Sequence, residues 1–215
     1  MAGLEGNTFF DGPAGRIEAI LKEPKVPVSR VAIVCHPHPL FGGTMHNKVV
    51  FHLARAFEHL GFATLRFNFR GVGRSAGEHG YGREEQNDLR AAMEFVRARY
   101  PQAEQWLAGF SFGSEVMLRT GCGCRGIAAM AAAGLPLSAY QFREATECGK
   151  PILFVQGSED NFGPPADLAR FYDGLSEPKR LVVIPGTGHF FEGRLTELQE
   201  AVADFVQWTL NTKEP

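Results

Sequence analysis

The sequence predicts an α/β protein with a mostly parallel central sheet and helices on both of its faces. Strand-like apolar segments alternate with helical segments along nearly the whole chain, which is the order that builds such a sheet. Residues 31–35 form a continuous apolar run, as expected of a strand buried on both faces. A serine in a Gly-x-Ser-x-Gly pattern, at residues 109–113, stands where a strand passes into a helix.

The remaining elements follow from apolar spacing and from glycine and proline breaks. Residues 16–21 are expected to form an antiparallel edge strand. The other strands are expected at residues 31–35, 62–69, 105–108, 126–133, 151–157 and 180–185. Helices are expected from Lys48 to the stop at Gly61, over 89–96 before Tyr100-Pro101, and around 115–119, 168–175 and 198–206.

Ser111 is the strongest candidate for a reactive side chain. A serine on a tight strand-to-helix turn has its hydroxyl pushed outward at the end of a sheet. Gly109 and Gly113 flank it, and a Cβ at either position would crowd the turn or the adjoining helix. The pattern therefore predicts a nucleophile elbow.

Two further side chains supply what a serine nucleophile needs. A hydroxyl requires a base to remove its proton, and the base requires a carboxylate to orient it. Asp160 follows the strand at 151–157, and His189 follows the strand at 180–185. The chain order of Ser111, Asp160 and His189 matches the order used on sheets of this kind. Glu159 is the competing carboxylate.

These segments together resemble the α/β-hydrolases, and more narrowly the small lidless bacterial hydrolases of the dienelactone-hydrolase and prolyl-oligopeptidase-like branch. Residues 35–45 (CHPHPLFGGTM) resemble that branch's loop after the third strand, and residues 68–75 (NFRGVGRS) resemble its turn after the fourth. The likeness runs from about residue 16 to about residue 210. It implies one hydrolase domain over residues 1–215 that needs no cofactor and no metal.

The resemblance also implies an oxyanion hole made of two backbone N–H groups. One is expected from Phe112, which follows the nucleophile. The other is expected from the loop after the third strand, where His38 aligns best and Leu40 is second. Pro37 stands where the family usually has glycine.

The substrate pocket is expected to be open and partly aromatic. Residues 134–150 are too few to build a cap of several helices between two strands. Phe41, Phe162 and Phe190 neighbour the predicted site loops and can form an apolar acyl or aryl pocket.

Composition and net charge limit the classes of partner that the protein is expected to bind. The chain has 215 residues and a net charge of −2, so no basic surface predicts binding to nucleic acid or to an anionic membrane. No signal peptide or transmembrane run is visible, which favours a cytoplasmic protein. The four cysteines have no zinc-type spacing and are expected to be mostly free thiols. A monomer or a homodimer fits equally well.

Two other kinds of site, for a metal and for a dinucleotide, have weaker support in the sequence. His36, His38, His46 and His52 could indicate a metal, but no carboxylate lies among them and the spacing is not that of a zinc motif. Residues 71–76 match a dinucleotide-binding glycine pattern, yet a loop follows them instead of a helix.

The sequence therefore predicts a serine hydrolase, and most specifically a carboxylesterase acting on small soluble short-chain esters. A peptidase or amidase of the same fold is the first alternative. A non-catalytic binding protein on the same fold is the second, and the intact Ser111, Asp160 and His189 argue against it.

Overall fold

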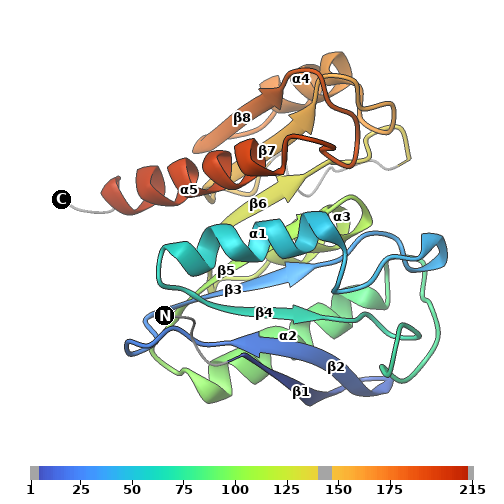
Figure 1. The fold of residues 1–215 in the computed structure, drawn as a ribbon, viewed down its shortest axis with the longest axis vertical. Helices are drawn as coiled ribbons and strands as arrows, with labels where there is room; N and C mark the ends of the chain where they lie inside the picture. The colour runs from blue at the N-terminus through green and yellow to red at the C-terminus, as the bar shows by residue number, and fades with distance from the viewer. Residues whose placement is uncertain (1–4, 140–146, 213–215) are drawn as a thin grey trace.

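A computed structural model describes residues 5–139 and 147–212, and within them eight strands form one sheet (Figure 1). The strands are β1 (Glu5–Gly12), β2 (Gly15–Lys22), β3 (Arg30–Cys35), β4 (Ala63–Phe67), β5 (Glu104–Phe110), β6 (Ile127–Ala133), β7 (Ile152–Gly157) and β8 (Lys179–Ile184). The helices are α1 (Lys48–His59), α2 (Glu85–Arg99), α3 (Phe112–Gly121), α4 (Pro165–Asp173) and α5 (Leu195–Asn211), with a short 3-10 helix η1 (Pro39–Phe41).

The sheet order is β1-β2-β4-β3-β5-β6-β7-β8. Every neighbouring pair from β4 to β8 is parallel, whereas β2 pairs antiparallel with both β1 and β4. The mostly parallel sheet predicted from sequence is confirmed.

One strand prediction was wrong in position. Residues 16–21 lie in β2, which is antiparallel as expected, but β1 forms the edge outside it. The sequence of β1, EGNTFFDG, mixes polar residues and glycines with two phenylalanines and carries little strand signal. Its register with β2, from Glu5 opposite Lys22 to Gly12 opposite Gly15, is that of a tight hairpin between consecutive strands.

Helices cover both faces of the sheet. In Figure 1, α1 and α5 lie side by side in front of the sheet, while α2 and α3 lie behind it. Alternate residues of a strand point to opposite faces, so Ala32 and Val34 of β3 join the core under α1 and α5, and Val31 and Ile33 join the core under α2 and α3. Trp106 is fully buried on the α1 and α5 side.

The parallel strands bring the loops after β3, β5, β7 and β8 to one edge of the sheet, as carboxyl ends of parallel strands must. Between β6 and β7, residues 134–139 and 147–151 form turns and irregular chain, and residues 140–146 of the expected lidless segment lie outside the described residues. None of the described helices is both long and apolar enough to cross a membrane.

The cysteine prediction requires a correction. Cys122, just past α3, and Cys148, just before β7, form a disulfide, while Cys35 and Cys124 are free. Their sequence separation is 26, so no local spacing motif marked the pair. The fold brings them together because α3 ends beside the chain that enters β7.

The disulfide should stabilise the fold. Replacing Cys122 and Cys148 together by Ser should lower the free energy of unfolding by about 3 kcal/mol, because the open chain gains conformational entropy when unfolded. Urea unfolding of the oxidised protein and the double variant measures this difference. Cys124→Ser is the matched control, and an equal loss in that variant would contradict the assignment.

Candidate active site

The backbone of Ser111 is held in an unusual conformation between β5 and α3. Its φ is 55° and its ψ is −122°, a region that favours glycine. A Cβ on Gly109 would collide with the backbone of Gly113, and one on Gly113 would collide with the carbonyls of Cys35 and His36. The two glycines therefore allow the sharp turn, as the sequence predicts.

His189 lies against the Ser111 hydroxyl. Its Nε2 is 2.9 Å from Ser111 Oγ, and its Nδ1 is 2.8 Å from Asp160 Oδ2. A carboxylate accepts hydrogen bonds, so Nδ1 carries a proton, and a neutral ring then offers Nε2 as the acceptor for the serine proton. This is the arrangement in which an imidazole can act as a general base toward a hydroxyl.

Asp160 is the carboxylate that the fold brings to His189. It is buried, whereas Glu159 is exposed. Asp160 Oδ1 accepts the N–H groups of Phe162 (2.8 Å) and Gly163 (3.2 Å), so the loop after β7 fixes the carboxylate on its far side. The choice of Asp160 over Glu159 made from sequence agrees with this geometry.

Gln156, at the end of β7, is a supporting residue that the sequence did not reveal. Its side-chain Nε2 donates to Asp160 Oδ2 at 2.7 Å and to the carbonyl of Gly163 at 2.9 Å. Its Oε1 accepts the N–H of Leu135 at 3.0 Å. A buried amide with both ends satisfied holds the acid loop to the chain after β6, but in sequence it reads as one polar residue ending an apolar strand.

His36 anchors the loop after β3. It is fully buried, its Nδ1 donates to the carbonyl of Pro37 at 2.6 Å, and its Nε2 accepts the N–H of Phe69 at 3.0 Å. Asn68 Oδ1 accepts the N–H of Met45 at 2.8 Å. The chain after β4 therefore holds both ends of the loop after β3.

The two expected oxyanion donors lie on neighbouring segments. Phe112 is the first residue of α3, where a helix leaves its N–H groups without helical partners. The N–H of Leu40 donates to His38 Nδ1 at 3.2 Å, so it is already used within the loop. Of the two alternatives from sequence, the N–H of His38 is therefore favoured. Burial and the nearby His79 lower the pKa of the His38 side chain, which keeps Nδ1 free to accept.

Comparisons with known proteins identify the family to which the chain belongs. A family model described as serine aminopeptidase, S33 matches residues 29–139, and one described as PhoPQ-activated pathogenicity-related protein matches residues 137–215. An α/β serine hydrolase homologue from Coxiella burnetii is 40% identical, with a TM-score of 0.88 over 93% of this chain and 96% of its own. The chain belongs to the α/β-hydrolase superfamily.

Other solved members extend the comparison. A Xanthomonas campestris α/β serine hydrolase without a lid is 37% identical, with a TM-score of 0.87 over 94% of each chain. An esterase from Pyrococcus furiosus is 16% identical, with a TM-score of 0.83 over 95% of this chain and 92% of its own. At that identity the esterase shares the fold alone, whereas the first two share the family.

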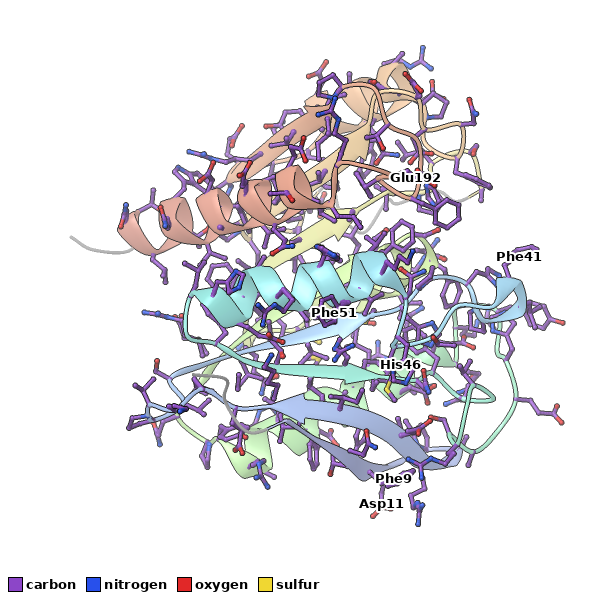
Figure 2. The ribbon with its side chains drawn as sticks, in the orientation of Figure 1. Phe9, Asp11, Phe41, His46, Phe51 and Glu192 are labelled. Atoms are coloured by element: carbon purple, nitrogen blue, oxygen red, sulfur yellow. A yellow bond between two sulfur atoms is a disulfide. The ribbon has the colours of Figure 1, made fainter. Side chains whose placement is uncertain are left out.

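A cavity of about 190 Å³ opens in front of Ser111 in this α/β-hydrolase. Its lining consists of Pro37, His38, Phe41, Gly42, Gly43, Asn47, Ser111, Phe162, His189 and Phe190. The three phenylalanines predicted from sequence are thus brought together at its rim. Phe41 is 87% exposed, Phe162 54% and Phe190 50%. Figure 2 shows Phe41 projecting from η1 on the side to which β3 and β4 point.

The histidines considered for a metal do not converge. Both ring nitrogens of His36 are engaged by backbone, while His46 and His52 line a separate hollow near Phe51. Within residues 5–139 and 147–212, no three histidine, cysteine or acidic side chains gather as metal ligands would.

The buried His36 predicts a pH dependence of stability. Burial lowers its pKa from 6.5 to about 4. Between these values the unfolded chain binds more protons than the folded one, so the free energy of unfolding should fall as the pH drops below 6.5. The limiting slope is about 1.4 kcal/mol per pH unit for one proton.

Urea unfolding between pH 7 and pH 4.5 measures that slope. His36→Gln removes the titrating ring and should flatten the curve relative to the unmodified protein, since all other titrating groups are common to both. Parallel curves for the two proteins would contradict a neutral, buried His36.

Proposed function

We propose that this protein is a serine hydrolase that cleaves small short-chain carboxylic esters through Ser111, His189 and Asp160. One observation carries the proposal: a hydrogen-bonded chain runs from Asp160 through His189 to Ser111, at the mouth of an apolar cavity. The α/β-hydrolase family membership supports it.

In the first half of the reaction, Ser111 Oγ attacks the ester carbonyl. His189 Nε2 takes the hydroxyl proton as the bond forms, and Asp160 stabilises the resulting imidazolium. The N–H groups of Phe112 and His38 stabilise the negative oxygen of the tetrahedral intermediate. Collapse of that intermediate breaks the ester bond, and His189 gives its proton to the departing alcohol.

In the second half, water attacks the acyl-enzyme. His189 takes a proton from that water, the tetrahedral intermediate forms again in the same oxyanion hole, and the acid leaves as the proton returns to Ser111 Oγ. The open cavity admits this water.

Peptide hydrolysis is a second candidate because one matching family model is described as a serine aminopeptidase. An aminopeptidase must bind a charged amino terminus, and a carboxylate is the group that would bind it. The ten residues that line the cavity in front of Ser111 include no aspartate or glutamate. The cavity therefore favours esters with uncharged acyl groups.

The nucleophile can be tested by covalent labelling. Ser111→Ala should lose labelling by a fluorophosphonate and nearly all activity on p-nitrophenyl acetate, while its thermal unfolding shows a folded protein. Ser114→Ala is the control, since Ser114 lies in the first turn of α3 and its hydroxyl donates a hydrogen bond to the carbonyl of Ser111. Labelling that persists in Ser111→Ala would overturn the assignment.

The choice of Asp160 as the acid can be tested by comparing it with Glu159. Asp160→Asn should lower kcat by about 10²–10⁴, because an amide in that place leaves the imidazole in the wrong tautomer. Glu159→Gln changes an exposed carboxylate and serves as the matched comparison. A larger loss in Glu159→Gln would show that the wrong carboxylate had been chosen.

Substrate size follows from the cavity. An acyl chain gains about 0.8 kcal/mol per CH₂ only where protein buries it. A cavity of about 190 Å³ with an exposed aromatic rim covers a few carbons or one ring. On p-nitrophenyl esters, kcat/KM should peak from acetate to butanoate and fall beyond about C6–C8. A steady rise to C12 would reveal a buried acyl tunnel.

A further inference from the structure

The side chain of Asn47 carries an acceptor oxygen and a donor nitrogen, and the fold uses the oxygen. Asn47 is the N-cap of α1, where its Oδ1 accepts the N–H groups of Val49 at 2.9 Å and Val50 at 3.5 Å. Its own N–H donates to the carbonyl of Thr44 at 3.0 Å. Both the backbone and the side-chain oxygen of Asn47 are therefore fixed.

The cap also fixes the amide nitrogen. Only an oxygen can accept the N–H groups of Val49 and Val50, so Nδ2 must point away from the helix. No hydrogen bond from Nδ2 to another described residue is present, and Asn47 lines the cavity in front of Ser111. Asn47 thus brings a side chain with two uncommitted N–H groups to the lining of a largely apolar cavity.

Most of the other polar atoms in the lining of this cavity are already hydrogen-bonded within the protein. Ser111 and His189 are hydrogen-bonded to one another, and His38 Nδ1 accepts the N–H of Leu40. Proline, glycine and phenylalanine make up the rest of the lining. Because His38 Nδ1 accepts, Nε2 carries the ring proton, so the side-chain donors left among the described lining residues are that single N–H and the two N–H groups of the Asn47 amide.

A second hollow of about 420 Å³ adjoins the first, and both are lined by Asn47 and Phe190. Its other lining residues include Lys48 and Glu192, whose charges are of opposite sign. Glu192 lies on the same side of the molecule as Phe41 (Figure 2). A substituent passing Asn47 therefore has room beyond it, in surroundings without a net charge.

We infer that Asn47 Nδ2 determines specificity by donating to a neutral oxygen of the substrate, such as an ether, ketone or hydroxyl oxygen a few atoms from the ester. This inference rests on the proposed function, because it concerns the same cavity. A charge-balanced second hollow favours a neutral acceptor over a carboxylate. The substrate class becomes short esters that carry one additional oxygen.

Two variants separate the donor from the cap. Asn47→Asp keeps the capping oxygen and the shape of the side chain but turns the donor into an acceptor. Asn47→Ser keeps a capping hydroxyl and removes the amide. Both residues are good N-caps, so α1 should remain folded, and thermal unfolding verifies this.

Matched esters provide the readout. p-Nitrophenyl methoxyacetate is compared with the butanoate, and the 4-oxopentanoate with the pentanoate, so each pair tests an added acceptor oxygen on the acyl side. 2-Methoxyethyl acetate against butyl acetate tests the alcohol side. The ratio of kcat/KM within a pair is then compared between proteins, which cancels the intrinsic reactivity of each ester.

In at least one pair, the preference for the oxygen-bearing ester should fall about three- to tenfold in Asn47→Ser, the size of one hydrogen bond. This preference should fall further in Asn47→Asp, because the new carboxylate oxygen and the added oxygen of the ester are both acceptors. The pair that responds shows whether the oxygen belongs to the acyl or the alcohol part.

Unchanged ratios in all three pairs, with both variants folded, would overturn the role of Asn47 and leave it as a helix cap. The proposed function fails by a different measurement, namely absence of Ser111-dependent ester hydrolysis in the unmodified protein. The two failures are therefore distinguishable.

Discussion

The backbone conformation of Ser111 is the constraint on which the candidate site depends. Its positive φ exists because Gly109 and Gly113 let β5 turn directly into α3. The same closeness presses Gly113 against the carbonyls of Cys35 and His36. The Ser111 hydroxyl and the loop after β3 are thereby positioned relative to each other by close main-chain packing.

Asp160 and His189, the proposed acid and base, are held by a second, separate set of contacts. Asp160 receives hydrogen bonds from His189, Gln156 and the N–H groups of Phe162 and Gly163, so both of its oxygens are fixed. A carboxylate held in this way cannot rotate when charge develops on the imidazole. The site is built before a substrate arrives, which is the condition for electrostatic stabilisation without reorganisation.

Features marked by a local residue pattern could be predicted from the sequence, whereas features that depend on contacts between separate segments could not. The glycines around Ser111 form a recognisable pattern, and Asp160 and His189 each follow a predicted strand. Helix α1 begins at Lys48, as its apolar pattern predicts. The Cys122–Cys148 bond joins residues 26 apart in the sequence, and the outer strand β1 depends on its pairing with β2 because its own residues carry little strand signal. Gln156 and Asn47 are single amides in the sequence, and their surroundings come from distant segments: Gln156 is hydrogen-bonded to Leu135, and Asn47 lines the cavity in front of Ser111.

The φ of 55° at Ser111 has an evolutionary consequence. A side chain in this conformation is strained by about 1–3 kcal/mol, whereas glycine adopts it at little cost. Replacement of this serine by glycine would therefore relieve the strain, and two of the six serine codons reach a glycine codon by a single nucleotide change. A chain that has serine here gains a hydroxyl at the cost of that backbone strain.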